Sequence, residues 1–150
     1  MKKSPYTLAI MTTLLCVAAM GCLDFGQDEE TTTPTESQVS RCRAEMYLNP
    51  TVNITPLGFK LEGSGIDDAI WFKFETDADD LAQVFDTSVV DLSKFKEGYS
   101  LSELKGVAWW DVGGKNLWGG PVALPHVRYM SVGAEKIEGG YVVYVMWNET

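Results

Sequence analysis

The feature that most constrains the fold is an uninterrupted apolar run near the C-terminus. Residues 141–147 are seven consecutive apolar residues, and Gly139-Gly140 precedes them. A strand without polar alternation is typical of the centre of a sheet that is covered on both faces. Two glycines tolerate the positive φ of a two-residue hairpin turn. Residues 127–137 are therefore expected to form the antiparallel partner of a central strand over residues 141–147.

Further strand signals precede this hairpin. Residues 58–62 and 104–111 are expected to be strands, and residues 69–75 alternate so that one face is apolar. After residues 69–75 the spacing of apolar residues changes, because Ala78, Leu81, Ala82 and Phe85 follow helical spacing. Thr76 and Asp79 resemble a capping box, which predicts a helix of two to three turns. The predicted fold is α+β and β-rich: a small antiparallel sheet or sandwich with one short helix packed on it.

The N-terminus has the pattern of an export signal. Lys2 and Lys3 precede an apolar stretch over residues 8–20, which is shorter than the roughly 20 residues that span a membrane. Gly21-Cys22 closes it, and residues 1–22 resemble the signal and lipobox of bacterial lipoproteins. That resemblance implies removal of residues 1–21 and acylation of Cys22. Leu23, rather than Asp, follows the cysteine, which by analogy favours the outer membrane where two membranes are present.

The same residues allow a second interpretation. Ala19 and Gly21 also fit an ordinary signal-peptidase site, which would leave Cys22 as a plain N-terminal residue. Cys42 is then available for a disulfide with Cys22. If Cys22 is acylated, Cys42 is instead expected to be buried and inert or to pair between chains.

Composition divides the rest of the chain into two parts. Residues 22–40, the acylated cysteine and an acidic, threonine-rich segment, are expected to be a disordered tether, and residues 41–150 a single β-rich domain. Loss of Lys2 and Lys3 from the 12 basic residues leaves a formal charge of −11 against 21 acidic residues. Such a chain lacks the basic footprint of a nucleic-acid-binding protein. It also lacks the basic segments that anionic lipid head groups attract, so the expected link to the membrane is the acyl group on Cys22.

Motifs for metal, nucleotide or nucleophilic chemistry are incomplete. A calcium loop starting at Asp77 fails because Leu81 and Ala82 stand at its fifth and sixth positions. Gly113-Gly114-Lys115 lacks the remaining residues of a phosphate loop. His126 could act in a small hydrolase with Asp111 or another acid, but no signature surrounds a nucleophile. No catalytic residue, metal ligand or cofactor is assigned.

The remaining functional lead is a tryptophan-rich segment. Neighbouring strand residues point to opposite faces, so one of Trp109 and Trp110 is expected to face outward. An exposed indole beside a carboxylate or amide can stack on a sugar or anchor a partner. The alternative is that every tryptophan belongs to the core. The candidate binding residues are Trp109, Trp110, Asp111, Asn116 and Trp118.

The expected function is that of a lipid-anchored envelope protein with a binding or structural role. Its ligand would be an envelope protein, a glycan or a small apolar molecule. The alternative is a small hydrolase that acts on envelope material through His126 and a nearby carboxylate.

Overall fold

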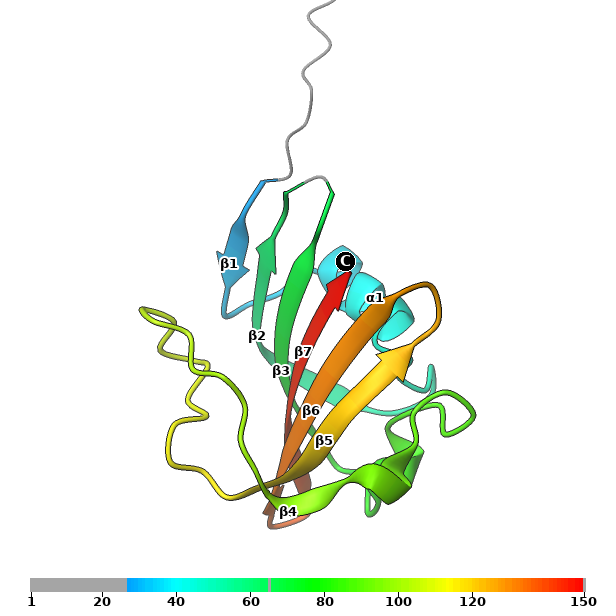
Figure 1. The fold of residues 1–150 in the computed structure, drawn as a ribbon. Coiled ribbons are helices and arrows are strands. Elements are labelled where there is room, and N and C mark those ends of the chain that lie inside the picture. Colours follow the sequence, from blue (N-terminus) through cyan, green and yellow to red (C-terminus); the bar gives the residue numbers. More distant parts are fainter. Residues whose placement is uncertain (1–26, 65, 150) are drawn as a thin grey trace, which may run out of the picture.

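The computed structural model describes residues 27–64 and 66–149, which form one seven-stranded antiparallel sheet (Figure 1). The sheet order is β1-β2-β3-β7-β6-β5-β4, so β1 and β4 form its edges. The predicted antiparallel α+β class is confirmed, with a single open sheet rather than a sandwich. The elements are β1 (Glu29–Thr31), α1 (Glu36–Glu45), β2 (Ile54–Glu62), β3 (Ala69–Thr76), the 3₁₀ turns Leu81–Gln83 and Leu92–Lys94, β4 (Lys96–Tyr99), β5 (Leu117–Leu124), β6 (Arg128–Ile137) and β7 (Gly140–Glu149).

The prediction that the last strand is central is confirmed. Strand β7 pairs with β3 on one side and with β6 on the other. Gly139 adopts a φ of +82°, and a side chain on Gly140 would collide with the carbonyl of Thr76. The hairpin turn is Glu138-Gly139 rather than the predicted Gly139-Gly140, because Gly140 already pairs with Ile137 as the first residue of β7. Glycine is required at position 139 by backbone conformation and at position 140 by close approach.

Alternation along β7 divides the core into two layers. Val143, Val145 and Trp147 point to one face of the sheet, and Val142 and Tyr144 point to the other. The first face, here called the helix face, is covered by α1 and by residues 77–95. The second, the loop face, is covered by residues 100–116, here called the covering loop, on the opposite side in Figure 1. The strongly apolar central strand thus requires cover on both sides.

Residues 28–40 are not a disordered tether, which corrects the expected domain boundary at residue 41. Strand β1 pairs with β2, and α1 begins within this segment. Thr35 and Gln38 form a capping box, in which each side chain accepts a hydrogen bond from the other residue's backbone N–H. Cys42 of the helix and Met46, its C-cap residue, are buried on the helix face, and Val39 packs beside them. A threonine-rich composition hid a helix start that the Thr-x-x-Gln spacing could have revealed.

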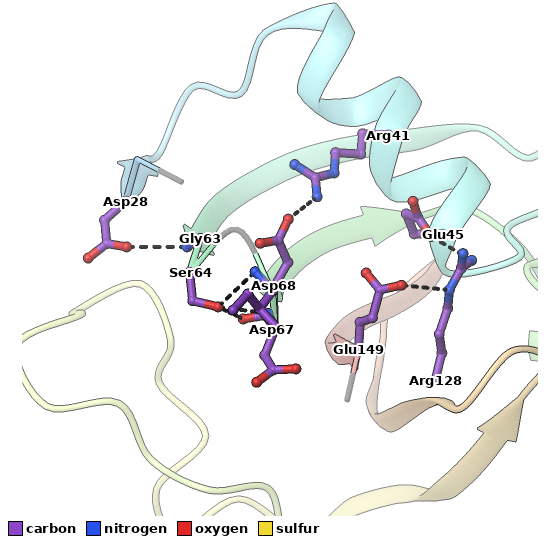
Figure 2. Close-up of polar contacts among 10 residues, drawn as sticks. Asp28, Arg41, Glu45, Gly63, Ser64, Asp67, Asp68, Arg128 and Glu149 are labelled. Carbon is purple, nitrogen blue, oxygen red and sulfur yellow. Dashed lines mark hydrogen bonds and ion pairs between the residues drawn. The ribbon is translucent and has the colours of Figure 1, made fainter. Parts of the chain in front are cut away.

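Ion pairs fix α1 to the end of the sheet where β7 finishes (Figure 2). Arg41 pairs with Asp68 at 2.8 Å, and Arg128 of β6 pairs with Glu45 at 3.0 Å. Arg128 also lies 3.7 Å from Glu149. These contacts join residues far apart in the chain, so the helix is part of the domain.

The helix predicted around residues 78–85 is wrong. The segment contains only the 3₁₀ turn Leu81–Gln83, which Asp80 caps through the backbone N–H of Ala82. Thr76 does not cap a helix, because its hydroxyl donates to the carbonyl of Asn53. Leu81 and Phe85 are nevertheless fully buried on the helix face. The helical spacing of these apolar residues arises because an irregular segment packs on the sheet. Periodicity alone cannot distinguish such a segment from a helix.

The strand predicted over residues 104–111 is also wrong. These residues belong to the covering loop and form turns and irregular backbone. Val107, Trp110 and Val112 are buried because the loop packs on Tyr144 and Trp71. Burial of Trp71 also corrects the expectation of a single apolar face on β3. The predicted strands at residues 58–62, 69–75 and 127–137 correspond to β2, β3 and β6.

Substitution of Val143 or Val145 with Asp is expected to prevent folding. Each side chain is completely buried in the central strand, and an unpaired buried carboxylate costs several kcal/mol against a total stability of about 5–15 kcal/mol. The measurement is the yield of soluble protein and its thermal unfolding. Tyr129→Asp on β6 is the control, because Tyr129 is 49% exposed. Folding of either valine variant as well as the control would contradict the central placement of β7.

Candidate functional site

The five candidate binding residues do not form one patch. Trp109, Trp110 and Asp111 lie in the covering loop on the loop face, and Trp118 packs beside the core of the helix face. Asn116 is exposed at the end of the covering loop, directly before β5. The sheet thus separates the candidate binding residues into two sites, one on each face. The two sites differ in how many of their polar groups already make hydrogen bonds or ion pairs within the protein.

On the loop face, Asp111 is the centre of a polar cluster. Its Oδ1 accepts hydrogen bonds from Lys73 Nζ at 2.6 Å and from the hydroxyl of Tyr144 at 3.0 Å. Lys115 Nζ lies 3.7 Å from Asp111 Oδ2 and donates to Glu135 at 2.7 Å. Each charge in the cluster therefore has a partner of opposite sign. The cluster joins the covering loop to β3, β6 and β7.

The pKa values reflect this mutual stabilisation. Partial burial alone would raise the pKa of Asp111, but the hydrogen bonds from Lys73 and Tyr144 and the charge of Lys73 hold it below its ordinary value. Burial raises the pKa of Tyr144, and its contact with Asp111 raises it further. The hydrogen bond to Glu135 raises the pKa of Lys115. Asp111 and Lys115 thus stay charged, and Tyr144 stays neutral, over the ordinary pH range.

Trp109 and Trp110 pack the covering loop onto the sheet. The two rings meet edge to face at 5.9 Å, and Trp110 meets Tyr144 in the same way at 5.6 Å. Trp110 is 3% exposed, and its indole N–H donates to the carbonyl of Ser102. A side chain on Gly58 would collide with the ring of Trp109. For Trp110 the structure agrees with the core alternative, and Trp109 is partly buried against the same cluster.

Replacement of Asp111 with Asn is expected to weaken attachment of the covering loop in a pH-dependent way. The depressed pKa means that the carboxylate stabilises the fold above its ordinary value of 3.8 and that this contribution is lost as the pH falls. Because Asp111 is about half exposed, the loss near neutral pH should be about 1 kcal/mol. Urea unfolding at several pH values measures it.

The control for this variant is Asp67→Asn, since Asp67 is exposed and makes no ion pair with a described residue. The Asp111 variant should be less stable than the native protein near neutral pH and should lose less stability between about pH 5 and pH 3. Equal pH profiles for the Asp111 variant and the native protein would show that the cluster does not hold the loop.

On the helix face, Trp118 borders an open hollow of about 410 Å³. Trp118 pairs with Ala134 across β5 and β6, and Lys136 pairs with Tyr141 across β6 and β7. Ala134 leaves space because its side chain is short. Residues on the segment after β3 close the opposite side. The hollow is lined by Asp79, Asp80, Trp118, Ala134, Lys136 and Tyr141.

Several polar groups of this hollow have no partner within the described part of the chain. The indole N–H of Trp118, the ammonium of Lys136 and the carboxylate of Asp79 make no hydrogen bond or ion pair there. Lys136 instead lies 4.1 Å from the centre of the Tyr141 ring. Phe95 supports Trp118 edge to face at 5.3 Å. The Trp118 hollow therefore offers a supported aromatic ring together with free donors and acceptors.

A second hollow of about 410 Å³ lies between α1 and β2, but its polar groups are engaged. Gln38 donates to Glu29 at 2.6 Å and accepts from the backbone N–H of Thr35. Arg41 is paired with Asp68. A ligand there would have to break existing contacts, so the Trp118 hollow is the better candidate.

The pairing required by the hydrolase alternative does not form between His126 and Asp111. His126 lies in the exposed turn before β6 and has a φ of +62°. Asp111 accepts a hydrogen bond from Tyr144, whose partner on β6 is Gly133. Gly133 lies about 17 Å along β6 from Arg128, which follows the turn that contains His126. Asp111 and His126 are therefore near opposite ends of β6. No carboxylate of a described residue lies within ion-pair distance of His126.

Cys42 carries a free thiol in the core of the helix face. Burial raises its pKa to about 12, which leaves it a protonated, unreactive thiol at neutral pH. This matches the buried and inert state that was one of the two expectations for an acylated Cys22. Residues 1–26, which include Cys22 and the lipobox-like segment, lie outside the described residues.

Comparison with protein-family models, curated proteins and solved structures finds no match to this chain. Over the described ranges, no helix is long and apolar enough to cross a membrane. The site therefore has to be interpreted from its own chemistry. The sequence indicates Trp118 but not Lys136, Tyr141 or Asp79, because strand register brings Lys136 and Tyr141 beside it and the irregular segment after β3 brings Asp79.

Proposed function

We propose that the protein is a non-enzymatic binding protein of the bacterial cell envelope, held on a membrane by an acylated Cys22. The observation that supports a binding role is the Trp118 hollow, where free donors and acceptors surround a supported aromatic ring. Trp118 is half-buried with an indole N–H that has no partner among the described residues, and the exposed side chains of Asp79 and Lys136 beside it are available to a ligand. The support for the anchor is the export signal that ends in Gly21-Cys22.

The fold gives the proposed anchor a consequence for orientation. Only residues 23–28 separate Cys22 from β1, and six residues span at most about 20 Å. Asp28 accepts a hydrogen bond from the backbone N–H of Gly63, which places the chain's entry beside the β2–β3 turn (Figure 2). Tyr141, which lines the hollow, lies at the opposite end of β7, about 27 Å from Glu149. The anchored domain would therefore hold its hollow away from the membrane.

The anchor predicts a measurable mass. Intact protein from the membrane fraction should exceed the mass of the polypeptide from Cys22 to Thr150 by two or three acyl groups. Cys22→Ala should abolish the added mass and release the protein from the membrane, because the remaining chain has no other lipid attachment in this proposal. An unmodified mass for the native protein would refute the anchor.

Occupation of the hollow predicts protection of its aromatic residues. Hydroxyl-radical footprinting should oxidise Trp118 and Tyr141 more slowly in native envelopes than in purified protein. Tyr99 of β4 is the internal control, because it is partly exposed on the loop face beside Leu117, away from the hollow and from the membrane-proximal end, and should react equally in both samples. Equal oxidation of Trp118 in the two samples would show that no envelope component occupies the hollow.

A further inference from the structure

We propose that the ligand of the Trp118 hollow is an uncharged sugar ring within an oligosaccharide of the envelope. This inference rests on the proposed binding function and names its ligand class. It depends on three features of the hollow: its aromatic surface, its mixture of hydrogen-bonding groups and its charge.

The aromatic surface suits a ring with an apolar face. Trp118 is half-buried, and Phe95 supports it from the side. Ala134 beside it is too short to cover the indole, so part of the ring borders the open space. Gluco-configured sugars carry equatorial hydroxyls and present only C–H groups on their faces. Such a face can pack on an indole while its rim stays polar.

The polar groups suit hydroxyls, which both donate and accept hydrogen bonds. The indole N–H of Trp118 and the ammonium of Lys136 are donors without a hydrogen-bond partner among the described residues. Asp79 provides a free carboxylate acceptor, and Asp80 uses its Oδ1 to cap the following turn. Residues that carry free donors and acceptors thus line one hollow together with the indole, as recognition of a sugar rim requires.

Charge excludes the main competing small ligands. Asp79 and Asp80 lie against the hollow and would repel an anion. A cation would compete with Lys136, which already occupies the face of Tyr141. A lipid tail packed on Trp118 would give its indole N–H no hydrogen-bond partner, which is unfavourable. An uncharged polar ring avoids all three penalties.

The test uses the acylated protein in detergent with 5-fluorotryptophan in place of its five tryptophans. Fluorine NMR follows each indole, and Trp118→Phe assigns the resonance of the hollow. The probes are cellotetraose and tetra-N-acetylchitotetraose, which are uncharged, and tetragalacturonic acid, which is anionic. The uncharged tetrasaccharides should shift the Trp118 resonance with a dissociation constant of about 0.1–1 mM, as expected for a shallow site. The anionic probe should not.

Variants on the rim separate recognition from folding. Asp79→Asn and Lys136→Ala change exposed side chains, and each should weaken binding by about tenfold for one lost charged hydrogen bond. Trp118→Ala should abolish binding, which isothermal titration calorimetry measures because this variant lacks the reporting indole. Tyr129→Ala, an exposed aromatic residue on the other face, should bind as the native protein does. Unfolding curves establish that each rim variant is folded.

Lack of any Trp118 shift at about 10 mM of either uncharged probe would overturn the sugar proposal, because that is tenfold above the weakest expected dissociation constant. Equal binding by the native protein and both rim variants would also overturn it. If Trp118 is protected in envelopes and protease treatment removes this protection, the ligand is a peptide and the sugar proposal is wrong. In that outcome the binding function and the anchor would still stand. Loss of protection after glycan digestion would support the sugar.

Discussion

Burial of β7 on both faces is the constraint on which the structure depends. Every side chain from Val142 to Val145 is buried, two on each side of the sheet. A sheet with two apolar faces needs two covering layers, but the described chain contains one α-helix of ten residues. Irregular segments therefore provide most of the cover, and they pack residues such as Leu81, Phe85, Val107 and Trp110 against the strands.

The irregular segments that cover the sheet lack the regular backbone hydrogen bonds of helices and strands. Their backbone N–H and C=O groups therefore need other hydrogen-bond partners. Aspartates start successive turns on the helix face, where Asp80, Asp86 and Asp91 each accept a hydrogen bond from a backbone N–H two residues on. Asn49 donates to the carbonyls of Gln83 and Phe85. The covering loop is held instead by Trp110 and by the ion pairs of Asp111. Several of the acidic residues thus have a structural role, although the sequence alone shows them only as a large negative charge.

The strands could be predicted because their signals are local. The two glycines at positions 139 and 140 and the apolar run after them indicate the hairpin and its central place, although the turn itself lies one residue earlier, at Glu138-Gly139. The helix at residues 78–85 and the strand at residues 104–111 could not be predicted, because apolar residues in irregular cover have no period of their own. Helix α1 was missed for the opposite reason: its capping box lies in a polar segment whose composition indicates disorder.

The candidate site was predictable only in part, for a related reason. Composition identifies Trp118, but nothing local indicates that it lies on the opposite face from Trp109 and Trp110. Lys136 and Tyr141 reach it through strand register, which depends on the whole sheet. Asp79 reaches it through an irregular segment. A site formed from four separate segments leaves no compact motif in the sequence.

The two edges of the sheet bear on how copies of this protein would coexist. Strand β1 has three residues, and β4 has four with a register irregularity between Lys96 and Tyr99. Short, irregular and charged edges offer few aligned backbone groups to a neighbouring strand. Attachment to a membrane would confine copies to two dimensions and raise their local concentration. The fold therefore allows a crowded layer of domains in which neighbours can collide repeatedly without joining their sheets.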